Sequence, residues 1–166
     1  MQICLNCLNT YEEGVKVCPH CGLGNWKYQA AEKTLELGTM LKSRYKIGTV
    51  IGDGGFGITY RAVDMNTGKG VAVKEFYPRE VVARSSMDHT TVKLVNRDNT
   101  AQFQKGLNSF LEEANGLARF NNTDKIVNVY DFFEANNTAY IIMEYVDGVL
   151  LKDYLERQGR MEPEVA

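Results

Sequence analysis

Four cysteines stand in two close pairs near the start of the chain, at Cys4, Cys7, Cys18 and Cys21. Two Cys-x-x-Cys pairs can supply four thiolates to one tetrahedral Zn²⁺ ion. Residues 1–24 contain few large apolar side chains and need such a staple to fold. Two disulfides are the alternative interpretation. Because four thiolates leave no open coordination position, the spacing predicts a structural zinc ribbon, with His20 outside the ligand set.

A glycine-rich segment could hold phosphates. Gly52, Gly54 and Gly57 form the pattern Gly-x-Gly-x-x-Gly, which dinucleotide-binding folds and kinases share. A dinucleotide-binding fold needs a helix after the glycines, but residues 58–63 are rich in β-formers. The segment is therefore predicted to join two antiparallel strands and to fold over a ligand as a flap. An ordinary glycine-rich hairpin is the alternative.

Lys74 follows on the next predicted strand. Because strand side chains alternate, Ala72 and Lys74 share one face, which suits a flat base near the alanine and phosphates near the lysine. A lysine held there needs a carboxylate. The helical phase of residues 103–118 places Glu113 at the edge of the apolar face and Glu112 nearly opposite, so Glu113 is the predicted partner. A solvated helix surface is the alternative for both glutamates.

The elements that must position these residues are short strands and one long helix. β-rich runs occupy residues 45–51, 58–63, 71–77, 126–133 and 139–144, and apolar spacing predicts a helix over 103–118. Residues 78–100 are predicted to form a long loop with one short strand near 91–95. A short helix is expected over 149–157, and Pro163 suits the first turn of another.

Composition limits the classes of function. The 166 residues carry 19 basic and 21 acidic side chains, a net charge of −2, so no basic field exists to hold nucleic acid by neutralising its phosphates. No apolar run approaches the roughly 18 residues of a transmembrane helix. Residues 1–10 lack the charged and apolar regions of a secretory signal. We therefore expect a cytoplasmic protein with reduced thiols, which favours zinc over disulfides.

Four motifs together resemble a known family. They are Ile51-Gly52-Asp53-Gly54-Gly55-Phe56-Gly57, Val71-Ala72-Val73-Lys74, Phe110-Leu111-Glu112-Glu113-Ala114 and Met143-Glu144-Tyr145-Val146-Asp147-Gly148. In combination they make residues 44–166 similar to the N-terminal lobe of a bacterial, eukaryotic-like Ser/Thr protein kinase. The resemblance implies an α+β fold in which a small zinc ribbon precedes a five-stranded antiparallel sheet with helix αC, and the C-terminal lobe is absent.

The expected organisation is a zinc ribbon at 1–24, a linker or short helix at 25–40, the kinase N-lobe at 41–148, and the hinge exit and start of the C-lobe at 149–166. Two departures from the family pattern stand out. Thr59 occupies the place of a valine that usually follows the third glycine. The segment 78–100 is longer than the usual connection to helix αC.

The resemblance also implies roles for individual residues. Lys74 would contact the α- and β-phosphates of ATP and pair with Glu113, so these two are the expected catalytic residues. Met143 would be the gatekeeper, and backbone groups of Glu144 and Val146 would recognise adenine. The expected nucleotide-binding residues are Ile51, Gly52, Gly54, Gly55, Phe56, Gly57, Thr59, Ala72, Lys74, Met143, Glu144 and Val146.

Phosphoryl transfer further needs a catalytic-loop Asp, an Asn and a second Asp that holds Mg²⁺. The chain contains no His-Arg-Asp, and Asp131-Phe132-Phe133 precedes the hinge and lacks the glycine of Asp-Phe-Gly. We therefore expect a piece of a longer kinase, one that uses ATP, Mg²⁺ and protein substrates but is inactive by itself.

Two other classes of function remain open. One is a docking or dimerisation module without catalysis, and the other is a zinc-dependent nucleic-acid binder, which the charge balance disfavours. Self-association is expected through apolar residues that a C-lobe would otherwise cover, namely Met143, Tyr145, Leu150, Leu151 and Tyr154.

Overall fold

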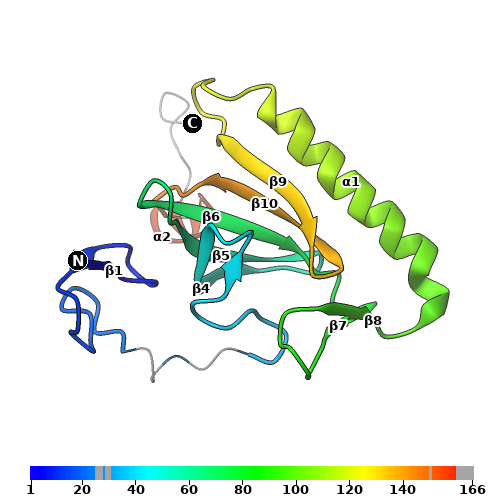
Figure 1. The fold of residues 1–166 in the computed structure, drawn as a ribbon. Coiled ribbons are helices and arrows are strands. Elements are labelled where there is room, and N and C mark those ends of the chain that lie inside the picture. The colour runs from blue at the N-terminus through cyan, green and yellow to red at the C-terminus, as the bar shows by residue number, and fades with distance from the viewer. Residues whose placement is uncertain (25–27, 29–30, 150, 160–166) are drawn as a thin grey trace.

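The computed structural model describes residues 1–24, 28, 31–149 and 151–159 (Figure 1). Trp26 in the expected linker and the helix start expected at Pro163 lie outside these residues. Among the residues that are described, no helix combines the length and the apolar character needed to cross a bilayer.

A six-stranded antiparallel sheet lies at the centre of the molecule, in the order β3–β4–β5–β6–β10–β9 (Figure 1). Its strands are β3 (Met40–Leu41), β4 (Tyr45–Asp53), β5 (Gly57–Asp64), β6 (Lys69–Phe76), β9 (Val129–Ala135) and β10 (Thr138–Glu144). The five longer strands are those that the sequence predicts, although β9 begins later than expected.

The prediction of a five-stranded sheet is wrong by one short strand. The chain turns at Gly38, whose φ is 91°, and the Ile47 N–H then donates to the Thr39 carbonyl oxygen at 2.8 Å. This turn brings β3 beside β4, where Leu41 pairs with Tyr45. Leu35 is also buried in the core, so the described end of the expected linker packs on the sheet.

Helix α1 (Thr100–Ala118) lies along one face of the sheet, beside β9 and β10 (Figure 1). Its buried residues, Leu107, Phe110 and Ala114, recur at helical spacing and pack with Phe76. A side chain at Gly106 would meet the Phe76 ring, so this glycine permits the close approach of helix and sheet. A second helix, α2 (Leu151–Gln158), follows β10.

The opposite face of the sheet is covered by the segment that precedes α1. Where the sequence predicts one short strand, two form, β7 (Val82–Arg84) and β8 (Val92–Leu94), which pair as a separate two-stranded sheet. A short 3₁₀ helix, η2 (Arg97–Asn99), then leads into α1. Val82 and Val92 belong to the apolar cluster on this face, so residues 78–100 are a packed layer and not an open loop.

A buried ion pair joins this layer to the sheet. The side chains of Glu75 on β6 and Arg84 on β7 are 0% and 1% exposed, and their charged groups lie 2.6 Å apart. The hydroxyls of Tyr60 and Tyr140 donate to the same carboxylate at 2.8 Å and 2.9 Å. Burial and this neighbouring negative charge raise the pKa of both tyrosines. Arg84 also donates to the Lys33 carbonyl oxygen at 2.9 Å, which ties down the entry to the sheet.

The N-terminal ribbon has its own small hairpin, β1 (Gln2–Ile3) and β2 (Thr10–Tyr11), and contacts the sheet at β4. The Thr49 N–H donates to the Leu5 carbonyl oxygen at 3.0 Å. A side chain at Gly48 would run into that carbonyl, and one at Gly70 would meet Leu8. The two glycines therefore leave the room that the ribbon needs to pack against the sheet.

Replacing Arg84 by Met should destabilise the chain by about 3–5 kcal/mol, because it leaves the Glu75 carboxylate buried without a cation. The double variant Arg84→Met, Glu75→Gln should regain part of the lost free energy of unfolding, because it no longer buries an unpaired charge. Lys42→Met is the control, because Lys42 is 50% exposed where it pairs with Asp131 at 3.1 Å, and should cost about 0–1 kcal/mol. Urea unfolding measures the free energy of unfolding of all three variants. Equal destabilisation by Arg84→Met and Lys42→Met would contradict the assignment of Arg84 as the buried partner of Glu75.

Candidate metal centre and nucleotide site

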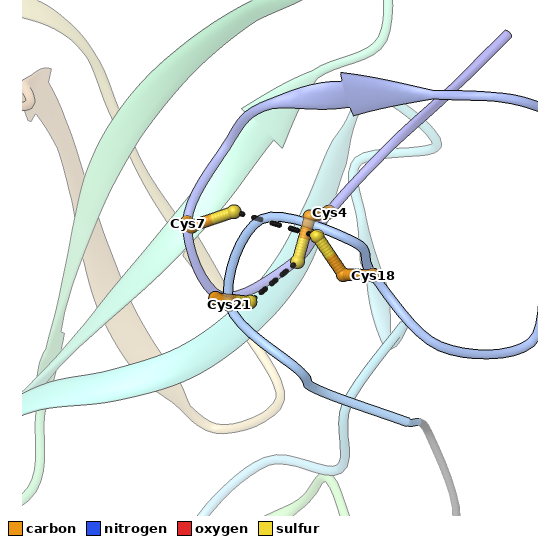
Figure 2. A group of neighbouring side chains, drawn as sticks. All are labelled: Cys4, Cys7, Cys18 and Cys21. Atoms are coloured by element: carbon orange, nitrogen blue, oxygen red, sulfur yellow. Dashed lines mark hydrogen bonds between the residues drawn. The ribbon is translucent and has the colours of Figure 1, made fainter.

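The four cysteine sulfurs converge on one point in the ribbon (Figure 2). All lie within 4.8 Å of one another, with Cys4 Sγ 3.6 Å from Cys21 Sγ and Cys7 Sγ 3.7 Å from Cys18 Sγ. All four thiols are free, so the predicted alternative of two disulfides is not the arrangement seen. Tetrahedral Zn–S bonds of about 2.3 Å put sulfurs about 3.8 Å apart, which these spacings match.

Two similar turns aim the thiols inward. The Leu8 N–H donates to the Cys4 carbonyl oxygen at 3.0 Å, and the Gly22 N–H donates to the Cys18 carbonyl oxygen at 2.9 Å. Both turns end in a residue of positive φ, which Gly22 adopts without strain and Leu8 adopts at 61°. The His20 ring lies 3.3 Å from the Thr10 carbonyl oxygen and is not part of the cluster.

The metal-free thiols differ in acidity. Burial raises the pKa of Cys4 to about 12. Burial would also raise the pKa of Cys21, but hydrogen bonds from the Leu23 backbone, from Asn6 and from neighbouring thiols outweigh it and lower the pKa to about 6. A zinc ion needs thiolates, so its binding must displace the proton that Cys4 holds at neutral pH.

The predicted lysine and glutamate face each other between sheet and helix. Lys74 Nζ on β6 lies 3.9 Å from Glu113 Oε1 on α1, and 5.5 Å from the centre of the Phe110 ring. The side chains are 37% and 57% exposed, so solvent screens the pair. Glu112 is exposed on α1. The helical phase therefore picked the correct glutamate for this ion pair.

The glycine-rich segment forms the turn between β4 and β5. The Gly54 N–H donates to the Gly57 carbonyl oxygen at 2.9 Å and closes the turn. A side chain at Gly57 would collide with the Glu75 carbonyl oxygen of β6, so only glycine allows this strand approach. At the tip, Phe56 is 81% exposed. The loop therefore joins two antiparallel strands, as the sequence predicts.

Two cations outside the predicted set hold this turn. Lys33 and Arg79 both form ion pairs with Asp53, and Arg79 also donates to the Gly54 carbonyl oxygen at 3.0 Å. The hydrogen bond from Lys33 is the main reason that the pKa of Asp53 falls below its usual value. No local sequence pattern predicts that Lys33 or Arg79 pairs with Asp53, because both are distant from it in sequence and are brought to the turn by the packing of their own segments.

Strand pairing brings five of the expected nucleotide-binding residues together. Thr59 pairs with Lys74, and Met143 of β10 pairs with Ala72 of β6. Gly52 lies opposite Thr59 on the neighbouring strand. These residues therefore form one continuous part of the sheet.

Other expected residues lie at the borders of this area. Ile51 and Val146 line a cavity of about 490 Å³ beside the segment after β10. Gly55 and Phe56 instead line a separate cavity of about 310 Å³ with Phe103. The tip of the glycine-rich turn thus lines a different cavity from Ile51 and Val146.

Glu144 ends β10, and its side chain is already engaged. Its carboxylate accepts a hydrogen bond from Asn128 Nδ2 at 2.8 Å, and its backbone N–H donates to the Asn128 carbonyl oxygen at 2.8 Å. The acidic side chain thus braces the approach to β9. Any contact that Glu144 makes with a base must use its backbone, which is the role that the resemblance implies.

Purified chain should contain about one zinc ion, because four thiols at tetrahedral spacing fill one coordination shell. Cys18→Ser should lose the metal and unfold the ribbon but leave the sheet folded, since no cysteine belongs to either large apolar cluster. Metal analysis and circular dichroism check both parts. Metal-free protein with reduced thiols, or a wild-type zinc content in Cys18→Ser, would contradict this prediction.

Comparison with known proteins agrees with this geometry. Residues 45–166 match the family model of the protein kinase domain. The chain is 33% identical over 126 residues to a probable serine/threonine-protein kinase of Clostridium acetobutylicum, covering 76% of this chain and 16% of that protein. It is 34% identical over 130 residues to the serine/threonine-protein kinase PknB of Mycobacterium tuberculosis, covering 76% and 17%.

A solved structure described as the PpkA-294 apo form superposes with a TM-score of 0.71 at 36% identity, covering 76% of this chain and 43% of that one. Of the two curated kinases named above, the chain spans only about a sixth of the length. The match of sequence, fold and the Lys74–Glu113 pair leads to one conclusion: the chain belongs to the protein kinase family.

Proposed function

We propose that this chain is the ATP-binding lobe of a Ser/Thr protein kinase that transfers the γ-phosphoryl group of ATP to protein substrates. The observation that carries the proposal is the Lys74–Glu113 ion pair at 3.9 Å, with Lys74 paired to Thr59 on the strand that follows the glycine-rich turn. A lysine held in this way can contact the α- and β-phosphates of a nucleotide. A docking module has no use for such a pair, so the pair favours the kinase over that alternative.

The remaining residues of the site have matching roles in the proposal. Ala72 and Met143 would line the adenine slot with Ile51, and the backbone of Glu144 and Val146 would hydrogen-bond the base. The backbone of the glycine-rich turn would cover the phosphates. Mg²⁺, when bound, would neutralise phosphate charge, but the 166 residues contain no His-Arg-Asp catalytic loop. We therefore infer that this chain alone does not transfer phosphoryl groups.

The chain should bind a fluorescent ATP analogue weakly, and Lys74→Met should weaken that binding about tenfold, which corresponds to about 1.4 kcal/mol. Lys93→Met is the matched control, because Lys93 is exposed on β8 and should leave the affinity unchanged. Equal losses of affinity in the two variants, or no binding by the wild type, would contradict a nucleotide site at Lys74.

The chain should transfer no phosphoryl group from radiolabelled ATP to a generic protein substrate. Transfer by the wild type that Lys74→Met abolishes would contradict the inferred inactivity of this chain.

Several apolar side chains that follow the sheet are exposed, and we propose that they drive self-association. Of the residues that the sequence predicts for this surface, Leu151 and Tyr154 are 60% and 40% exposed, Met143 and Tyr145 are half-buried, and Leu150 lies outside the described residues. Val146 and Val149 are also exposed, at 64% and 65%. Apolar groups gathered in one stretch tend to find a partner. Light scattering should give a mass that rises with concentration, and Leu151→Ser should reduce the rise. A constant monomer mass at high concentration would contradict this proposal.

A further inference from the structure

The turn between the first two cysteines is in contact with the sheet. Besides the bond between the Leu5 carbonyl oxygen and the Thr49 N–H, the Thr49 hydroxyl donates to Asn6 Oδ1 at 3.0 Å. Leu5 and Asn6 are the two residues between Cys4 and Cys7, and the Asn6 N–H points at Cys4 Sγ, 3.4 Å away. The same short turn therefore presents sulfurs on one side and hydrogen-bonding groups to the sheet on the other.

Arg61 connects this turn to the segment after β10. From the middle of β5, its Nη1 donates to the Asn6 carbonyl oxygen and, at 3.2 Å, to Asn6 Oδ1. Its Nε donates to the Tyr145 hydroxyl at 3.0 Å, and its guanidinium lies 5.3 Å from the centre of the Tyr145 ring. Tyr145 stands between Glu144 and Val146, whose backbone groups are the proposed adenine contacts.

The space around Arg61 is shared by the ribbon and this segment. Asn6 and Leu23 of the ribbon line the same cavity of about 490 Å³ as Tyr145 and Val146. Arg61 itself lines that cavity, so its guanidinium is the direct link between the two sides. A shift of the ribbon therefore reaches Tyr145 through one side chain.

We propose that Arg61 is a positioning residue that makes the geometry of residues 144–146 depend on metal in the ribbon. A metal on the four thiols holds the turn so that the Asn6 carbonyl faces Arg61, and Arg61 in turn holds Tyr145. Without metal, the turn loses its staple, because residues 1–24 contribute to neither large apolar cluster. Arg61 then loses its Asn6 acceptors and can leave Tyr145. The effect on nucleotide binding rests on the proposed function, whereas the effect on residues 144–146 does not.

Hydrogen exchange of the backbone amides of residues 144–147 tests the link without a nucleotide. In zinc-loaded chain the Glu144 amide, which donates to the Asn128 carbonyl oxygen, should exchange slowly, and chelation should speed its exchange about fivefold or more, the usual range of coupling between two sites. Arg61→Leu and Tyr145→Phe should cause the same increase while zinc content stays at the wild-type level. In either variant, chelation of zinc should then cause little further increase in the exchange rate.

Arg97→Leu is the matched control, because Arg97 is exposed on η2 and should leave both the exchange and its response to chelation unchanged. The link is overturned if Arg61→Leu and Tyr145→Phe keep wild-type exchange at residues 144–147 in the zinc-loaded chain. It is also overturned if the chain holds no zinc, or if chelation frees residues 4–8 without changing 144–147. Because the variants are measured with metal bound, unfolding of the metal-free chain does not hide the result.

Affinity for the fluorescent ATP analogue supplies the second measurement. If the proposed function holds, chelation and Arg61→Leu should each weaken binding about fivefold, and Arg97→Leu should not. If the zinc-loaded wild type binds no nucleotide, the proposed function fails for this chain, while the exchange of residues 144–147 still decides the link. An affinity unchanged by both chelation and Arg61→Leu would show that Arg61 does not position the site.

Discussion

The carboxylate of Glu75 has no exposure to solvent, and much of the architecture follows from that burial. A buried charge is costly unless a counter-charge and hydrogen bonds accompany it. Arg84 supplies the charge, and Tyr60 and Tyr140 supply hydrogen bonds from strands on either side of β6. Because Arg84 belongs to β7, the long segment before α1 must fold over the sheet to bring it in. The buried acid thus requires a packed layer where the sequence suggests a loop.

The same strand carries the candidate site on its other face. Lys74 precedes Glu75, so β6 presents one charge to the side of the candidate site and the next to the buried layer. Fixing that layer also fixes the start of α1, which must return along the sheet to place Glu113 beside Lys74. Arg79, in the same layer, reaches the glycine-rich turn at Asp53. One packing arrangement therefore positions the lysine, its partner and the glycine-rich turn.

The ribbon is part of this architecture even though it carries its own four-cysteine cluster. Its first cysteine turn lies against the sheet at Gly48 of β4 and Gly70 of β6, the glycines that leave space for it. Arg61 then places the ribbon one side chain away from the segment that would hold adenine. A metal centre that fills all four positions with sulfur has no open position for catalysis. The contacts of Arg61 therefore favour the mechanical role that we propose for the cysteine cluster.

Local patterns in the sequence were enough to predict the cysteine cluster, the five longer strands, helix α1 and the choice of Glu113, because each depends on residues a few positions apart. The tertiary structure alone decided β3, the pairing of β7 with β8, and the contacts of Arg61. These depend on partners distant in sequence: 55 residues separate Arg61 from Asn6, 84 separate it from Tyr145, and 65 separate Glu75 from Tyr140. A charged residue carries no local signal of which distant group it will meet, since that partner is set by how the layers pack.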